Sequence, residues 1–380
     1  MASLKILHIS DGDLDDPRIV NAALTGKKSG YDEYFCGENL GHTFKTDAFT
    51  KLIWIKIPSR ARIAKKTSQG LSKYWKWYPY PQHAIELERQ IRKVIDELRP
   101  DIVHAHNIFV ANHVSNMGIP MVLDDHEFYS LHIKAQNENA GFKKKIITNI
   151  KHDLWNRWEN EVGSKHPVIT VSSVIADHYK GFCKNVFSLP NYPTKDAIKF
   201  DYFSEASKGN LCSAYLGRDL ETAPNAVRNI GGLHTVFSSD KNTGNLLRVG
   251  VPEPNTPKIR SVGVLKMGDA YQTLNREAQI GLLPWHRHWF HPYCNPNKVY
   301  EYAHCGLWLA TIDDVKPVLD DFGEHCDTFG DYHGMAEILE HYNENPEELN
   351  KKRRAALEHA RANMVWEKHE HKILDAYKAA

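Results

Sequence analysis

Short apolar runs alternate with longer amphipathic stretches through the first half of the chain. Strands are predicted by the apolar runs at 4–10, 33–36, 52–58, 101–106, 121–125, 167–172 and 186–189. Helices are predicted where apolar residues recur at helical spacing, at 17–25, 85–98, 142–162 and 174–182. Because a crossover between parallel strands lays a helix on the sheet, this alternation predicts a parallel sheet covered on both faces.

A second series of the same kind follows a polar stretch that ends near residue 210. Its predicted strands are 212–216, 246–251, 261–265, 280–284 and 307–312, and its predicted helices are 297–304, 346–364 and 366–378. A single hydrophobic core rarely extends over 380 residues. The pattern therefore predicts two successive α/β domains.

Composition and charge exclude several classes of protein. The formal net charge is only +1, so no global field indicates a nucleic-acid partner. The six cysteines are scattered and form no Cys-x-x-Cys pair, which argues against a disulfide framework or a zinc site and favours a reducing compartment. The chain shows neither a signal peptide nor a membrane-spanning run, and a cytoplasmic location is expected.

The segment 280–306 carries the most informative chemistry. A strand leads into a loop, and a helix is predicted to open at Asn297. Free backbone N–H groups and the dipole at a helix start suit a phosphate group, and Lys298 adds a cation there. Glu301 lies one turn further along and suits a ribose diol. The alternative is an amphipathic helix with a solvated Lys–Glu face.

The same segment resembles a known signature. The run 296–302 followed by Gly306 is similar to the Pro-Asn-Lys-x-x-Glu-Tyr-x-x-x-Gly element of family-4 retaining glycosyltransferases. Weaker fragments recur in that family in the same order, at 99–106, 124–127, 170–176, 189–191 and 215–218. The resemblance implies an α/β fold of the GT-B class, with two Rossmann-like domains that face each other across a cleft.

The resemblance also implies where the domains begin and end and which substrate each of them binds. Residues 1–192 are expected to form an acceptor-side domain, 193–209 a linker and 210–365 a domain that binds the nucleotide sugar, while 366–380 form a helix that crosses back to the first domain. The expected reaction transfers a sugar from a nucleotide-diphosphate donor to a glycan or lipid-linked acceptor. Retention and independence of metal ions and other cofactors are implied.

Donor-binding residues are expected in both domains. By resemblance, Glu301 holds the ribose, while Arg218, Lys298 and the helix start at Asn297 take the diphosphate. The loop with Gly12 and Asp13 is expected against the donor, although a plain polar turn explains it as well. Two departures from the family stand out. Tyr293 occupies the position of a second Glu that touches the donor sugar in many relatives, and no Lys follows Arg218 within 219–225.

Acceptor-side chemistry is expected just after a strand of the first domain. His126 and Glu127 follow the strand at 121–125, and with Arg218 they are the candidate catalytic residues. A structural histidine and a helix-start acid are the alternatives. His104 and His106 end another strand, and one of them is expected to pack while the other faces the cleft.

Metal ligation is the weaker interpretation of the histidines near the donor segment. His286, His288 and His291 cluster around Arg287, and imidazole is the commonest metal ligand. Their spacing matches no His-Glu-x-x-His motif, and no Asp-x-Asp element is present where a sugar-diphosphate metal is expected. No metal site is predicted. As an alternative to metal ligation, Arg287 or Arg228 contacts the donor phosphates.

Two basic stretches contain interleaved aromatic residues. The segment 60–80 has six Lys or Arg residues and no acid, and the segment 142–158 opens with Phe-Lys-Lys-Lys. This combination suits an anionic membrane surface, with the protein peripheral on the cytoplasmic face. A solvated loop competes with this interpretation, and nucleic-acid binding is the least favoured. A GT-B nucleotide-sugar epimerase and a non-catalytic sugar- or membrane-binding protein also stay open as functions.

Overall fold

A computed structural model describes residues 3–12, 14, 16–38, 46–55, 81–200, 202–221, 226–239, 241–253 and 255–380; the side chains of 81–85 are outside the description. The chain divides into two compact units. Unit 1 comprises Met1–Pro190 together with His369–Ala380, and unit 2 comprises Asn191–Lys368. Asp13 and the segment 60–80, which carry predictions made from the sequence, lie outside the described residues.

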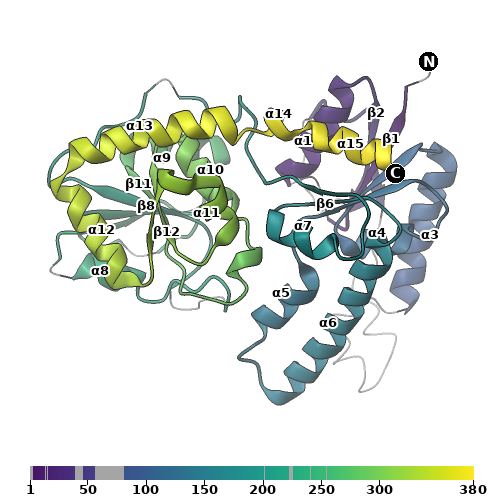
Figure 1. The fold of residues 1–380 in the computed structure, drawn as a ribbon, viewed down its shortest axis with the longest axis horizontal. Coiled ribbons are helices and arrows are strands. Elements are labelled where there is room, and N and C mark those ends of the chain that lie inside the picture. Colours follow the sequence, from purple (N-terminus) through teal and green to yellow (C-terminus); the bar gives the residue numbers. More distant parts are fainter. Residues whose placement is uncertain are drawn as a thin grey trace. The chain divides into compact units, whose positions relative to one another are not determined.

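Unit 1 is a parallel sheet with helices around it (Figure 1). In the described residues its strand order is β3-β2-β1-β4-β5-β6-β7. The strands are β1 (Lys5–Ile9), β2 (Asp32–Glu38), β3 (Lys51–Ile55), β4 (Ile102–His106), β5 (Met121–Asp125), β6 (Val168–Thr170) and β7 (Val186–Ser188). The helices are α1 (Pro17–Lys28), α3 (Pro81–Leu98), α4 (Ile108–Val114), α5 (Tyr129–Gln136), α6 (Phe142–Gly163), α7 (Ser173–Tyr179) and α15 (His371–Ala379).

The central strands of unit 1 are buried along their whole length. Every residue of β4 and of β5 is buried, which is the pattern of strands covered on both faces. Helix α1 begins where Asp16 accepts a hydrogen bond from the backbone N–H of Arg18, with Pro17 at the first helical position. The carboxyl ends of β1, β4 and β5 therefore lie beside the N-terminus of α1.

Unit 2 is a second parallel sheet, with the described strand order β10-β9-β8-β11-β12-β13. Its strands are β8 (Cys212–Leu216), β9 (Asn245–Val249), β10 (Ile259–Ser261), β11 (Ile280–Leu283), β12 (Trp308–Ile312) and β13 (Cys326–Phe329). Its α-helices are α8 (Leu233–Ser238), α9 (Met267–Glu277), α10 (Asn297–His304), α11 (Lys316–Phe322), α12 (Tyr332–Glu344) and α13 (Pro346–Asn363). Two short 3₁₀ turns, η1 (His291–Tyr293) and η2 (Gly323–His325), complete it.

The polar segment that joins the two series packs against unit 2. The buried guanidinium of Arg353, on α13, donates hydrogen bonds to the backbone oxygens of Ser204 and Gly306, both at 2.7 Å. Asn350 pairs with both backbone groups of Ala206. Ser204 and Ala206 are therefore held by side chains of α13.

The end of the chain returns to unit 1. After α14 (Trp366–His369), helix α15 packs against α1 and against β5, β6 and β7. Ile373, Ala376 and Tyr377 are buried there. The prediction of one helix over 366–378 was wrong, because the structure breaks it into α14 and α15.

Most predicted strands are confirmed, with one shift. β10 covers Ile259–Ser261 instead of 261–265. The short helices α4 and α5 were missed, because a helix of two turns carries too few apolar repeats to show a period. The longer helices α9 and α12 and the strand β13 were also not predicted. Among the described helices, none is both long and apolar enough to cross a bilayer.

Candidate active site

Strand register brings four polar residues of unit 1 together. His8 on β1 is paired in register with His104 on β4, and His106 on β4 is paired with Asp124 on β5. Alternate residues of a strand face the same side, so His104 and His106 share one face of the sheet. His8, His104, His106 and Asp124 are all fully buried. The expectation that one of the two β4 histidines faces a cleft was therefore wrong.

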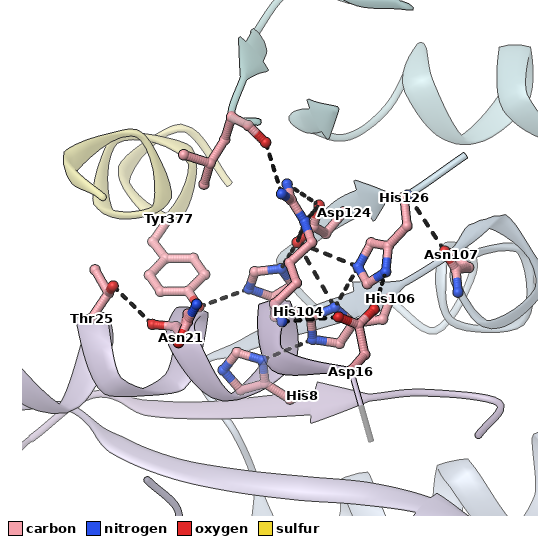
Figure 2. A network of polar contacts seen from close by, with 12 residues as sticks. His8, Asp16, Asn21, Thr25, His104, His106, Asn107, Asp124, His126 and Tyr377 are labelled. Atoms are coloured by element: carbon pink, nitrogen blue, oxygen red, sulfur yellow. Dashed lines mark hydrogen bonds and ion pairs between the residues drawn. The ribbon is translucent and has the colours of Figure 1, made fainter. Parts of the chain in front are cut away.

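Asp124 is the negative centre of this cluster, and Figure 2 shows its contacts. Arg18 of α1 donates to it through Nε and Nη2, with the shortest distance 2.7 Å. His104 Nε2 lies 3.3 Å from Asp124 Oδ2, and Tyr377 of α15 lies 2.8 Å from His104 Nδ1. Burial alone raises the pKa of Asp124, but Arg18 and neighbouring groups outweigh it and hold that pKa well below the usual range.

His126 sits where this buried cluster reaches the surface. Its Nδ1 lies 2.9 Å from Oδ2 of Asp16, and its Nε2 lies 3.2 Å from Nδ1 of His106. The imidazole is 10% exposed. Burial lowers the pKa of His126, yet the carboxylates of Asp124 and Asp16 overcome this and raise it to about 9. His126 is therefore an imidazolium at neutral pH.

Asp16, Arg18 and Glu33 were not predicted from the sequence as members of this site. Asp16 is the N-cap of α1 and its side chain is 38% exposed, so it presents a carboxylate to solvent beside His126. Glu33 is buried on β2, 2.8 Å from Nε2 of His8. Glu33 could have been found from the sequence, because a charged residue within a predicted buried strand needs a polar partner.

The other residues predicted for the acceptor side lie close by. Glu127 faces His132 of α5, with 2.6 Å between Oε2 and Nδ1, and its side chain is partly exposed. The carbonyl of Gly12 accepts a hydrogen bond from the N–H of Glu38, at 3.0 Å. A Cβ at Gly12 meets nothing closer than 3.9 Å, whereas one at Gly37 would lie 2.5 Å from the Gly12 oxygen. The close backbone approach is therefore made by Gly37.

Two groups in this cluster are compact enough to consider for a metal ion. Within the described residues they are His8 with His104 and His106, and His106 with Asp124 and His126. Every ring nitrogen of these four histidines already lies within hydrogen-bond distance of another protein atom. An ion would have to break several of these contacts, so the arrangement fits a hydrogen-bonded network better than a metal centre.

The helix start of unit 2 carries the cation that the sequence predicted. Lys298, in the first turn of α10, places Nζ 3.1 Å from Oη of Tyr215 and 4.2 Å from the centre of that ring. Its Nζ also lies 3.8 Å from Asp219. Burial lowers the pKa of Lys298 to about 7; Asp219 opposes this, and the positive charge of Arg228 adds to it. An anion bound here would restore the charge of Lys298.

Glu301 lies on the same helix, one turn after Lys298. Oη of Tyr271, on α9, donates to Oε1 of Glu301 at 3.1 Å. Burial raises the pKa of Glu301, while Tyr271 and Lys298 moderate the rise. The structure therefore brings the predicted cation and the predicted carboxylate together at one end of α10. Tyr271 was not predicted from the sequence.

The loop after β8 completes this end of unit 2. Gly217 has a positive φ of 157°, and a Cβ there would lie 2.7 Å from Nζ of Lys298. The loop therefore lies directly against Lys298, and the exposed Arg218 follows at once. Asn297 is the first residue of α10, after the N-cap Pro296, which supplies no side-chain cap. Tyr293 ends η1, and its ring lies 5.7 Å from that of Phe290.

A second cation lies beside Lys298. The guanidinium of Arg228 is 5.9 Å from the ring centre of Trp285, and Nζ of Lys298 is 5.7 Å from the same ring. Arg287, by contrast, is an exposed residue in an ion pair with Asp313. Arg228 is thus the better placed of the two arginines for a shared anion.

The histidines near the donor segment have structural partners. His291 bonds Asp314 through Nδ1 and the backbone oxygen of Val227 through Nε2, both at 2.7 Å. Nε2 of His286 lies 2.7 Å from the oxygen of Gly231. The backbone N–H of His288 donates to Asp314 at 2.8 Å. His286 and His291 fix the loop to its surroundings.

Comparison with protein families covers most of both units. Residues 57–188 match the family described as Glycosyltransferase Family 4, and residues 228–375 match the family described as Glycosyl transferase-like. The chain is a GT-B glycosyltransferase of the family-4 type. Its catalytic class, inferred from sequence by resemblance, is thereby confirmed.

Solved structures share the fold of this glycosyltransferase over its full length. Sucrose-phosphate synthase from Thermosynechococcus elongatus aligns with a TM-score of 0.70 and 11% identity, covering 99% of this chain and 98% of that one. A glycosyltransferase from Rickettsia africae gives 0.66 and 12%, covering 100% and 98%. The HepE protein of Anabaena, in complex with UDP-glucose, gives 0.66 and 11%, covering 99% and 100%. Comparison with curated protein sequences finds no match.

Proposed function

We propose that this glycosyltransferase moves a sugar from a nucleoside-diphosphate donor to a hydroxyl acceptor, with retention at the anomeric carbon and without a metal ion. One observation carries the donor half of the proposal. The partly neutralised cation of Lys298 stands at the start of α10, and the half-buried carboxylate of Glu301 lies one turn further along. A diphosphate and a ribose diol are a ligand pair that this arrangement suits.

The diphosphate is the proposed ligand of the cations. Lys298, Arg228 and the exposed Arg218 lie around one loop and one helix start of unit 2. Fixed cations and backbone N–H groups stabilise the charge that grows on a leaving diphosphate. The absence of a Lys after Arg218 is then compensated by Arg228. These cations supply charge that a metal ion provides in other transferases, which supports a metal-independent reaction.

The acceptor is proposed to bind at unit 1. Asp16 presents a carboxylate to solvent, and Glu127 is partly exposed nearby along the chain. Carboxylates accept hydrogen bonds from sugar hydroxyls, so a glycan or a lipid-linked sugar fits this chemistry. Both ring nitrogens of His126 are already held by Asp16 and His106. We therefore assign His126 to the support of Asp16, and assign the direct contact with the acceptor to Asp16 and Glu127.

Helix α6 is the proposed membrane contact. Phe142 is 79% exposed, and Ile146 and Ile150 are 45% and 46% exposed at the following i+4 positions. These residues form one stripe along the helix, and the exposed 143–145 triplet of lysines lies beside its start. Helices α5 and α6 run beside each other (Figure 1). An apolar stripe flanked by cations suits an anionic lipid surface.

A screen of nucleoside diphosphates tests the donor proposal directly. A ligand at 100 times its Kd adds about 2.7 kcal/mol to stability, which a thermal-shift assay resolves. UDP is the first candidate, because the similar HepE structure contains UDP-glucose. Stabilisation that persists in EDTA and is lost in Lys298→Met and Glu301→Gln is expected. A shift that appears only with added divalent metal would contradict metal independence.

Product analysis separates transfer from the two rival functions. A GT-B epimerase would convert the donor sugar without any acceptor, and a non-catalytic binder would leave the donor intact. Without an acceptor, we expect only slow hydrolysis of the donor. With an acceptor, we expect a new glycoside that keeps the donor's anomeric configuration. A donor epimer as the sole product would overturn it.

A further inference from the structure

Three histidine rings of unit 1 stand in line between two carboxylates. Starting inside, Oε2 of Glu33 lies 2.8 Å from Nε2 of His8, and Nδ1 of His8 lies 2.9 Å from Nε2 of His106. Nδ1 of His106 then lies 3.2 Å from Nε2 of His126, and Nδ1 of His126 lies 2.9 Å from Asp16. Figure 2 shows the outer part of this histidine chain, which ends at solvent.

Proton counting shows that the histidine chain holds one proton more than its neutral rings supply. Each of the four contacts needs one proton between its two heavy atoms, because two lone pairs that face each other repel. Three neutral imidazoles carry three protons, and two ionised carboxylates carry none. With only three protons, one buried contact would stay unbonded, at the cost of an unsatisfied polar group. A fourth proton removes that cost.

The surroundings place the fourth proton at the outer ring. His126 is faced by the carboxylate of Asp16 from the start of α1, and by Asp124 and Asp125 of β5, with Arg18 paired to Asp124. After burial, the largest influences on His106 are the rings of His104, His8 and His126, which together with burial hold its pKa well below the ordinary value. His126 therefore bears both N–H groups.

Different groups face the inner end. Burial raises the pKa of Glu33, and Asp32 on its own strand adds to the rise, whereas His8 of β1 lowers it. Tyr377 on α15 is a further neighbour. With His126 doubly protonated, the direction of every hydrogen bond is fixed. His126 donates to His106, His106 donates through Nε2 to His8, and His8 donates through Nε2 to Glu33.

We propose that Glu33 is a remote positioning residue of the glycosyltransferase, because the histidine chain that it ends keeps His126 doubly protonated. The N–H on Nδ1 of His126 then holds the carboxylate of Asp16 in place, ionised and ready to accept a hydrogen bond from a hydroxyl. What binds to Asp16 rests on the proposed function. The protonation pattern itself depends only on contacts within unit 1.

Glu33→Gln is the decisive substitution because it keeps the shape and removes the charge. The new amide can donate to Nε2 of His8, so three ring protons and one amide proton now fill all four contacts. The fourth ring proton is no longer required. We expect the pKa of His126 to fall by at least about one unit, and His106 to move its proton from Nε2 to Nδ1 in the same titration step.

Nitrogen-15 NMR of histidine-labelled full-chain protein measures both quantities, with signals assigned through single His→Gln variants. At pH 7.5 the wild type is expected to show His126 as an imidazolium and both His8 and His106 as neutral Nε2–H tautomers. Glu253→Gln is the matched control. Glu253 is a half-buried carboxylate of unit 2, 2.9 Å from Nη1 of Arg248 and outside the histidine chain. That variant should leave His106 and His126 unchanged.

Three results would overturn the proposal. A neutral His126 in the wild type, with Nδ1–H on His8 and His106, would place the extra proton on Glu33. An unchanged titration of His126 in Glu33→Gln would remove the coupling. Stoichiometric metal in the purified protein, released together with a change in the His8 and His106 signals, would make the cluster a metal centre. None of these readouts needs a substrate, so failure of the transfer reaction is scored separately.

Discussion

His126 keeps a charge that most histidines lose near neutral pH. Its pKa is raised to about 9, whereas an unfolded histidine titrates near about 6.5. Protonated His126 therefore stabilises the folded state fully below about pH 6.5, and this stabilisation is lost as pH rises through about 9. The shift corresponds to roughly 3 kcal/mol.

The effect is measured as the difference in the free energy of unfolding between the wild type and His126→Gln. The free energy of unfolding of the wild type should fall relative to His126→Gln between pH 6.5 and 9, by up to about 3 kcal/mol. Urea unfolding of both proteins across that range measures the difference, in which titrating groups outside the cluster around His126 cancel. Parallel curves for the two proteins would contradict the raised pKa.

Lys298 predicts the pH dependence of donor binding. Its pKa is lowered to about 7 in the free protein, and a bound diphosphate favours the charged form. Binding of UDP should therefore take up a proton above pH 7, and its affinity should weaken from pH 7 to 9. Calorimetry in two buffers of different ionisation enthalpy measures the proton uptake.

A pair of substitutions isolates this effect. Lys298→Met should lower UDP affinity by about tenfold or more and remove most of the pH dependence, since hydrogen bonds to charged groups contribute about 1.5–3 kcal/mol. Arg287→Met removes an exposed cation that Asp313 already neutralises, and it should leave binding unchanged. Equal losses in the two variants would indicate a general charge effect.

Residue-level prediction from the sequence succeeded where the relevant neighbours are close along the chain. Lys298 and Glu301 are one helical turn apart, so their spacing alone placed them on one edge. His126 was found because it follows a strand. Glu33 and Asp16 were missed because only the pairing of β1 with β2 and β4, and the position of α1, bring them to the histidines.

At the scale of elements, α6 carries the clearest prediction. Replacing Phe142, Ile146 and Ile150 together by Ser removes the apolar stripe and leaves the buried face of α6 intact. Binding to phosphatidylglycerol vesicles should fall by about tenfold or more, because each lost side chain contributes on the order of 1 kcal/mol or more at the interface. Vesicle co-sedimentation measures the bound fraction.

Matched controls separate insertion of the apolar stripe into the bilayer from non-specific adsorption of the protein to vesicles. Val264→Ser changes another exposed apolar residue, on unit 2, and should leave the bound fraction unchanged. Wild-type protein should bind phosphatidylcholine vesicles weakly, since the lysines at 143–145 then lack anionic partners. Equal binding to both lipids would contradict the role of these lysines.

Elements with a clear apolar repeat were predictable, but length alone did not decide the outcome, because the helices α9 and α12 were missed. The buried strands β4 and β5 and the long helices α6 and α13 follow directly from the pattern. The break between α14 and α15 was not predictable from periodicity, because the apolar residues Trp366, Ile373 and Tyr377 continue across it. In the structure Glu370 alone separates the two helices, and Glu367 of α14 accepts a hydrogen bond from the backbone N–H of Lys195.

At the scale of the whole molecule, unit 1 depends on the last residues of the chain. Deleting 369–380 removes Ile373 and Tyr377 from its core, along with the Tyr377 contact to His104. Two large buried side chains contribute about 2–3 kcal/mol each, which is a large share of a typical stability of about 5–15 kcal/mol. Unit 1 should lose protection from hydrogen exchange, while unit 2 should keep its affinity for nucleotide.

Exchange mass spectrometry on strands β1 and β4 measures the protection. Tyr377→Phe is the control; it removes only the hydroxyl, should cost about 1 kcal/mol and should preserve the protection. Wild-type protection in the truncated chain would show that α15 is dispensable for unit 1.

This dependence has a consequence for biosynthesis. Unit 2 is one uninterrupted segment, Asn191–Lys368, whereas unit 1 is split between the two ends of the polypeptide. Domains generally fold in order from the N-terminus as they leave the ribosome. Here unit 1 must wait, incomplete, until residues 369–380 have left the ribosome, so the later-made unit 2 is the first that can reach its native state.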